Sequence, residues 1–130
     1  MQIRSIQAGE LEAARRLLRE NGWERVNDAD EFRLLISRSQ HALVALANGE
    51  VVGFARALSD GLSNGYITML VVADSHRRKG VGRALIDAIV GNDRRMTWIL
   101  NARRPDLPLF YEKLGFTRST DAMERRRATS

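Results

Sequence analysis

The sequence contains no cysteine. This absence excludes disulfide bonds, thiolate nucleophiles and cysteine-ligated metal sites, and we predict no metal site of any other kind. No apolar run approaches the roughly 20 residues that a membrane-spanning helix needs. Residues 1–8 also lack the apolar core and the small-residue cleavage site of a secretory signal. We therefore expect a cytoplasmic protein that does not enter a membrane.

The composition that remains is that of a globular protein, and we expect one domain over residues 1–130. Hydrophobic residues make up 44% and charged residues 28%, which is enough to bury a core. The formal net charge of +5 favours a nucleic acid, an acidic membrane surface or a phosphate-bearing small molecule. Arg77–Lys79 with Arg83 interrupt a glycine motif, which favours the small molecule, whereas Arg125–Arg127 are expected in a solvated tail.

The periodicity of apolar residues predicts strands and helices mixed along the chain. Strands are expected over 1–6, 42–47, 51–58, 66–72 and 97–100. Helices are expected over 9–20, from Asp28 or Asp30 through Ile36, over 80–90 and from Pro105 to Gly115. A last strand or hairpin is expected from Phe116 to Arg125. Asn48-Gly49 predicts a tight hairpin turn. This order implies an α/β or α+β sheet covered by helices, with a right-handed crossover joining two parallel strands, 66–72 and 97–100.

The segment most informative about function joins strand 66–72 to helix 80–90. Glycines stand where the helix begins, and basic residues stand between them and the strand. The first turn of a helix offers unpaired N–H groups and the positive end of its dipole, and glycine lets an anion approach the backbone. We predict a diphosphate site formed by Arg77, Arg78, Lys79, Gly80, Val81, Gly82, Arg83 and Ala84.

Two other glycine motifs are excluded. A Walker A loop requires Lys-Ser or Lys-Thr after its last glycine, and Arg83-Ala84 follows Gly82 here. The dinucleotide fingerprint requires three glycines near the first strand, whereas this motif has two and comes late in the chain. An ordinary basic turn at the start of a helix remains the alternative interpretation.

The pattern Arg77-x-x-Gly80-x-Gly82 resembles the diphosphate-binding signature of the GNAT superfamily, the Gcn5-related N-acetyltransferases. An apolar Leu-x-Val strand precedes it, as in that family, with Leu70 and Val72 in the two positions. A second resemblance lies downstream, where Asn101 is followed by the segment 109–116.

Segment 109–116 matches the family text Phe-Tyr-Glu-Lys-x-Gly-Phe. The element order is also similar to the whole GNAT fold. This resemblance implies a mixed central sheet of six to seven strands flanked by four helices, with the parallel fourth and fifth strands splayed apart.

The resemblance further implies that acetyl-coenzyme A is the cosubstrate and that an amine attacks it directly in a ternary complex. The backbone amides of Leu70 and Val72 would contact the acetyl carbonyl and the pantetheine arm, and Val71 between them is also predicted to bind the cosubstrate. An N–H group aimed at the carbonyl would stabilise its developing oxyanion. Asn101 would bind the pantetheine or order the site.

Tyr111 is the predicted general acid, which would protonate the departing thiolate. Phe110 beside it is predicted to help bind the cosubstrate, and a core aromatic is the alternative role for Tyr111. The general base stays open, because many GNAT enzymes have a glutamate near the position of Tyr66. The candidates are His41, Asp60 and His76, with Glu31 in the helix that usually lines the acceptor cleft.

The acceptor is expected to be a small primary amine or an arylalkylamine, because segment 52–60 resembles a small bacterial and plastid subgroup associated with such amines. The alternatives are a protein lysine or N-terminal acetyltransferase, and a non-catalytic acyl-coenzyme A-binding regulatory domain. An acetyltransferase acting on aminoacyl-tRNA is the weakest alternative. Whether two copies form a homodimer stays open.

Overall fold

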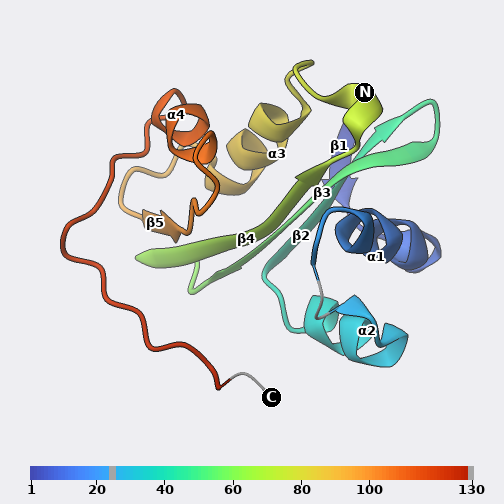
Figure 1. Ribbon diagram of the computed structural model, residues 1–130, viewed down its shortest axis with the longest axis horizontal. Coiled ribbons are helices and arrows are strands. Elements are labelled where there is room, and N and C mark those ends of the chain that lie inside the picture. The colour runs from blue at the N-terminus through green and yellow to red at the C-terminus, as the bar shows by residue number, and fades with distance from the viewer. Residues whose placement is uncertain (24–25, 129–130) are drawn as a thin grey trace.

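A computed structural model describes residues 1–23 and 26–128, which form a central sheet between two layers of helices (Figure 1). Its elements are β1 (Gln2–Ser5), η1 (Ala8–Glu10), α1 (Leu11–Glu20), α2 (Ala29–Ser37), β2 (His41–Ala47), β3 (Glu50–Ser59), β4 (Asn64–Val72), η3 (Asp74–His76), α3 (Val81–Val90), β5 (Thr97–Leu100) and α4 (Leu107–Glu112). The strand order is β1-β2-β3-β4-β5. Helices α1 and α2 cover one face of the sheet, and α3 and α4 cover the other.

The first two helices form for reasons that are visible in the sequence. Ala14, Leu17 and Leu18 recur at helical spacing on α1 and are buried against the sheet. At the start of α2, the Asp28 carboxylate accepts hydrogen bonds from the N–H groups of Asp30 and Glu31, at 2.9 and 3.0 Å. This contact identifies Asp28, rather than Asp30, as the cap among the two predicted candidates, since it satisfies two N–H groups that the helix itself cannot.

The sheet is antiparallel from β1 to β4 and parallel between β4 and β5. Asn48 and Gly49 both have positive φ, 52° and 80°, which confirms the predicted hairpin between β2 and β3. Helix α3 makes the crossover from β4 to β5 and packs on β3 at Gly53, where a Cβ would lie 2.9 Å from Cγ1 of Val81. The absence of a side chain there lets α3 approach the sheet.

Strand β4 contains a bulge at Met69, whose φ is +58°. Phe54 of β3 pairs with Val71, but Arg56 pairs with Thr68, so β4 carries one extra residue. Strand β5 pairs with β4 only over Asn64–Ile67. Among the described residues, the part of β4 beyond Ile67 therefore has no partner strand on the β5 side.

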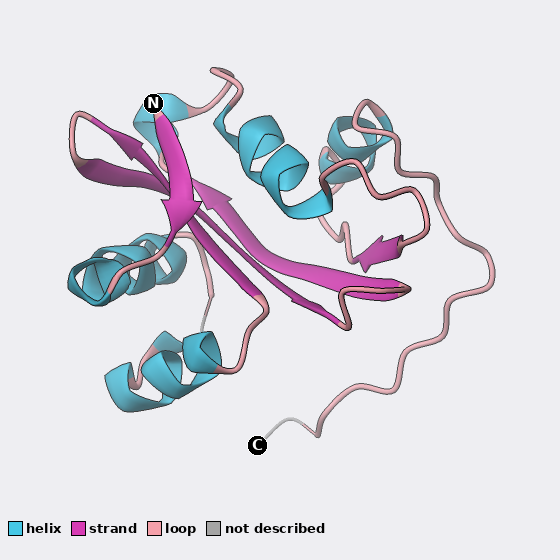
Figure 2. Cartoon of the chain, turned by 180° about the vertical axis from the view of Figure 1, so that it is seen from behind, coloured by secondary structure: helices cyan, strands magenta, loops and turns pink. Residues whose placement is uncertain are grey.

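The prediction of a last strand or hairpin from Phe116 to Arg125 is wrong. The structure contains no strand after β5 in its described part, so the sheet has five strands rather than six or seven. Between residues 117 and 128 the apolar residues are two alanines and Met123, which is 98% exposed. Such a segment has no alternating apolar face to bury, and it extends away from α4 without joining the sheet (Figures 1 and 2).

No helix in the described ranges combines the length and the apolar character needed to span a membrane.

Candidate active site

The loop before α3 presents its backbone as an anion site. Gly80 caps the helix in the left-handed conformation, with φ +82° and ψ 10°, and Arg78 also has a positive φ of 62°. The first helical bond runs from the N–H of Ala84 to the carbonyl of Gly80 at 3.0 Å. The N–H groups of residues 81–83 meet no acceptor among the residues described. They are therefore available to a phosphate.

The side chain of Arg77 forms hydrogen bonds and an ion pair that hold this loop, so its charge is already partly neutralised. Its Nε donates to the carbonyl of Val72 at 3.1 Å, and its guanidinium also contacts the carboxylate of Asp74 and the Oδ1 of Asn21. The side chain thus ties the end of β4 to the end of α1. The sequence indicated that Asn21 ends a helix but gave no sign of this contact.

The other basic residues of the loop differ in how far they are neutralised. Arg83 lies 3.7 Å from the carboxylate of Asp87, one helical turn along α3. Arg78 and Lys79 form no ion pair with any residue that the structure describes. The uncompensated positive charge beside the α3 N-terminus therefore comes mainly from Arg78 and Lys79.

Gly82 is required by packing as well as by access to the backbone. A Cβ at this position would lie 3.2 Å from Cζ of Phe110 and 3.7 Å from Cγ2 of Val72. The Phe110 ring of α4 therefore occupies the space where a side chain would project. Interpreting Gly82 only as an opening for a ligand was incomplete.

The free edge of β4 presents backbone groups next to this loop. The N–H of Ala73 donates to the carbonyl of Val52 at 2.8 Å, so residue 73 points toward β3. The N–H groups of a strand alternate in direction. The N–H of Val71 therefore also points toward β3, whereas the N–H groups of Leu70 and Val72 point to the opposite edge, where β5 no longer pairs with β4. The strand therefore exposes main-chain donors where the resemblance predicts contacts with pantetheine.

Tyr111 is 7% exposed and packs between two aromatic rings. The centroids of Phe110 and Phe116 lie 5.0 and 5.7 Å from its own. Its hydroxyl has no hydrogen-bond partner among the described residues. Burial raises the pKa of Tyr111 to about 12, so the phenol is protonated at neutral pH and has a proton that it can donate.

Asn101 follows β5 directly and links it to β4 and to the C-terminal segment. Its Nδ2 donates to Oη of Tyr66 at 3.2 Å and approaches Oε2 of Glu124 at 3.4 Å. Arg103 also contacts that carboxylate, at 2.9 Å. Tyr66, which stands near the position where many GNAT enzymes have a glutamate, is thus a hydrogen-bond partner of Asn101, the residue predicted to bind pantetheine.

Asp60 is poorly suited to act as a general base. Its carboxylate accepts the Ser63 hydroxyl at 2.6 Å and the N–H groups of Leu62, Ser63 and Asn64 at 2.8, 2.7 and 3.1 Å. These hydrogen bonds hold the pKa of Asp60 well below its usual range, and the bond from the Ser63 hydroxyl contributes most. The residue organises the β3–β4 loop.

The other base candidates lie on separate elements. His41 begins β2, and its ring meets the Trp98 ring edge-on at 5.9 Å. His76 lies in η3, where its Nδ1 is 2.8 Å from the Ser75 hydroxyl. Glu31 is exposed on the first turn of α2. The structure does not bring these three side chains together.

An open groove of about 680 Å³ lies at the end of the sheet where β3, β4 and β5 meet. We call it the Tyr66 groove, and its lining residues are Gln40, Leu58, Ser59, Asp60, Asn64, Gly65, Tyr66 and Ile99. Leu58, Tyr66 and Ile99 are paired across the three strands, which places their side chains in one apolar row.

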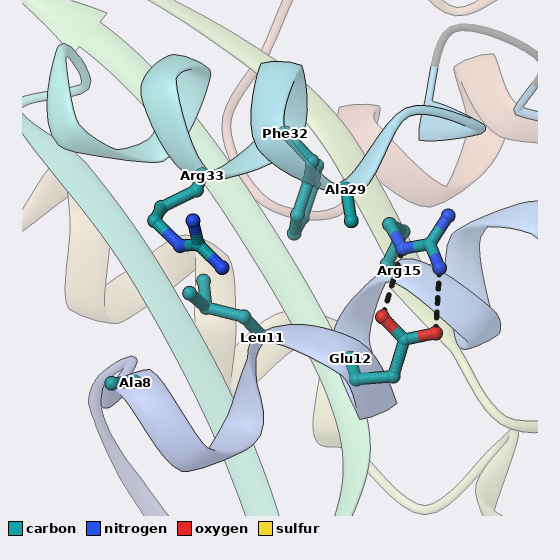
Figure 3. Close-up of a pocket in the computed structure, with 7 residues that line it drawn as sticks. All are labelled: Ala8, Leu11, Glu12, Arg15, Ala29, Phe32 and Arg33. Atoms are coloured by element: carbon teal, nitrogen blue, oxygen red, sulfur yellow. Dashed lines mark hydrogen bonds and ion pairs between the residues drawn. The ribbon is translucent and has the colours of Figure 1, made fainter.

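A smaller cavity of about 190 Å³ lies between α1 and α2 (Figure 3). The ion pair of Arg15 and Glu12, at 2.6 Å, forms part of its wall beside Leu11 and Phe32. It contains none of the predicted site residues, so we assign it no part in the reaction.

Residues 38–118 match the acetyltransferase (GNAT) domain family, and this match includes β4, the glycine loop, Asn101 and Tyr111. The chain belongs to the GNAT acetyltransferase family. A curated relative, the uncharacterized N-acetyltransferase ycf52 of Pyropia yezoensis, is 34% identical over 80 residues. That alignment covers 60% of this chain and 46% of the relative, so the chain matches less than half of the relative's length.

Solved GNAT structures share the fold over almost the whole chain. A GNAT-family acetyltransferase from Streptococcus pneumoniae TIGR4 has a TM-score of 0.80 at 24% identity, covering 98% of this chain and 96% of that one. A GNAT structure from Xanthomonas campestris pv. campestris has a TM-score of 0.78 at 23% identity, covering 98% and 94%. At such identities the likeness establishes the fold alone.

Within this GNAT fold, three contacts were not predicted from the sequence. Asn21 holds Arg77, Tyr66 bonds to Asn101, and Glu124 reaches Asn101 from the C-terminal segment. For Tyr66 a partial signal existed, because it lies in strand 66–72 and Asn101 follows the predicted neighbouring strand 97–100. For Asn21 and Glu124 we find none, since each contact joins segments far apart in the sequence.

Proposed function

We propose that this GNAT protein transfers the acetyl group of acetyl-coenzyme A to a primary amine by direct attack in a ternary complex. The observation that carries the proposal is the proximity in sequence and fold of two unpaired backbone surfaces. One is the N–H cluster of residues 81–83 at the start of α3, and the other is the edge of β4 beyond Ile67. A diphosphate joined to an amide-bearing arm is complementary to such a pair.

The residues fit coenzyme A in two parts. Backbone N–H groups from the α3 loop bind the diphosphate, with Arg78 and Lys79 adding positive potential. The N–H groups of Leu70 and Val72 pair with the amides of the pantetheine arm, as an added strand would. Asn101 orders the end of this channel.

Bound acetyl-coenzyme A supplies an activated thioester. During transfer the amine nitrogen bonds to the acetyl carbon and loses one proton to solvent water, while the carbon–sulfur bond breaks and the sulfur leaves as a thiolate. A β4 N–H stabilises the negative charge that develops on the carbonyl oxygen. Tyr111, which is protonated at neutral pH, donates its phenolic proton toward the departing sulfur and recovers a proton from solvent after transfer.

The acceptor enters from the face that carries the Tyr66 groove. The apolar row formed by Leu58, Tyr66 and Ile99 supports a small amine with an apolar body, such as an arylalkylamine. A protein acceptor and a purely regulatory domain are the competing functions.

Calorimetry with coenzyme A and a thiol-release assay over a panel of amines test the proposal together. We expect binding of coenzyme A in the micromolar range and turnover with at least one small amine. Peptide acetylation without small-amine turnover would favour a protein substrate. Tight coenzyme A binding with no turnover on either panel would favour the regulatory domain, and no detectable binding would refute the proposal itself.

A further inference from the structure

Arg56 lies on the acceptor face of the sheet, next to the Tyr66 groove. It pairs with Ala42 on β2 and with Thr68 on β4. This pair lies two residues along β3 and β4 from the pair formed by Leu58 and Tyr66. Residues two apart on a strand share a face, so Arg56 points to the same side as Leu58. Thr68 opposite it is the last residue before the β4 bulge.

Arg56 differs from the other sheltered arginines in having no acidic partner. Of the arginines that the structure describes, three are not exposed, namely Arg4, Arg15 and Arg56. Arg4 pairs with Glu10 and Arg15 pairs with Glu12. Arg56 forms no ion pair with a described residue, and burial lowers its pKa. A sheltered charge without a partner is costly, so its presence calls for a function.

A single hydrogen bond fixes the guanidinium from one side. Its Nε donates to the Ser39 hydroxyl at 2.7 Å, and that hydroxyl in turn donates to the carbonyl of Leu35 at 2.8 Å. The two terminal nitrogens donate to no described residue. An arginine held through Nε presents its remaining N–H groups as a fork, which is the geometry that a carboxylate accepts in a bidentate manner.

We propose that the acceptor amine of this enzyme also carries a carboxylate, and that Arg56 binds that carboxylate. The inference rests on the proposed function. Thr68 lies one strand spacing, about 5 Å, from Arg56 and directly before the free edge of β4. An anion on Arg56 therefore leaves the amine close to the edge where the thioester is proposed to lie, which favours a compact amino acid over a long polyamine.

The test compares acceptors that differ only in the carboxylate, such as phenylalanine against 2-phenylethylamine and 4-aminobutyrate against propylamine. The wild-type enzyme should prefer the carboxylate-bearing member of each pair. Arg56→Gln should raise KM for that member by about 10- to 100-fold, the range expected for a charge-assisted hydrogen-bonded pair, and leave the other member unchanged. Arg38→Gln, which removes an exposed charge at the end of α2, is the matched control.

Equal effects of Arg56→Gln on both members of each pair, or a wild-type preference for the amines without a carboxylate, would overturn the inference while leaving the proposed function intact. If no amine is acetylated, calorimetry with the same amino acids decides. Binding that Arg56→Gln abolishes would sustain the inference and remove only the transferase proposal, and absence of binding would overturn it. Should Arg56→Gln fail to fold, Ser39→Ala keeps the charge but removes its anchor, and a KM rise confined to the carboxylate-bearing amines is expected.

Discussion

Replacing Tyr111 by phenylalanine tests the burial of its phenol apart from any catalytic role. Burial raises the pKa of Tyr111 to about 12, against about 10 for a free tyrosine. The folded state thus holds the phenolic proton more tightly than the unfolded chain. The associated stabilisation is complete below pH 10 and is lost as the pH rises toward 12. Two pKa units correspond to about 2.7 kcal/mol.

The Tyr111→Phe variant cannot lose this stabilisation. Its free energy of unfolding should lie within about 1 kcal/mol of wild type at pH 7, since the hydroxyl has no partner among the described residues. Between pH 10 and 11.5 the wild type should lose stability more steeply than the variant. Urea unfolding followed by circular dichroism at pH 7, 9, 10.5 and 11.5 measures the difference. A constant difference across these values would show that the phenol ionises freely in the folded protein and would refute the argument.

At neutral pH the same variant should retain coenzyme A binding and lose turnover if Tyr111 is the acid.

Three further predictions concern the caps and the loop. Asp28→Ala should destabilise the fold by about 1 kcal/mol in urea unfolding, because it removes two N-cap bonds, whereas Asp28→Asn should cost less. Gly82→Ala should leave stability nearly unchanged, since the gain in helix propensity offsets the 3.2 Å contact with Phe110, but it should weaken coenzyme A binding in calorimetry by crowding the exposed N–H groups. Arg78→Gln and Lys79→Gln should each weaken that binding by about two- to fivefold at low salt and by less at high salt. An effect of either charge change that is independent of salt would contradict an electrostatic role.

The interior strands could be predicted because their local signals agree with their burial. The apolar runs over 42–47, 51–58 and 66–72 correspond to β2, β3 and β4, and Asn48-Gly49 fixes the register of the first two. Their ends differ by one or two residues, because the end of a strand depends on pairing and not on side chains. The last predicted strand was wrong for a different reason. The apolar Phe116 packs its ring against Tyr111 instead of beginning a sheet edge.

The site was predictable where it rests on glycine and helix-end chemistry, and not where it rests on contacts across the fold. Gly80 stands at the start of α3, as the motif predicted, and its left-handed conformation is one that glycine adopts without strain. The hydrogen bond between Arg77 and Asn21 forms only because the end of α1 lies beside the end of β4, which the sequence does not indicate. Arg56 was visible as the one charged residue within the apolar segment 51–58. Its lack of an acidic partner could be known only once the neighbours on β2, β4 and α2 had been placed.

The bulge at Met69 connects the two halves of the proposed reaction. Before it, Tyr66 and Thr68 face the side covered by α1 and α2, paired with Leu58 and Arg56. After it, Leu70 and Val72 face the opposite side and pack with α3. All four are even-numbered, and in a regular strand they would share one face. The extra residue reverses the alternation, so one strand presents acceptor-side residues in its first half and residues facing the α3 side in its second. Without the extra residue, Leu70 and Val72 would face the same side of the sheet as Tyr66 and Thr68, so the placement of both sites depends on this one bulge.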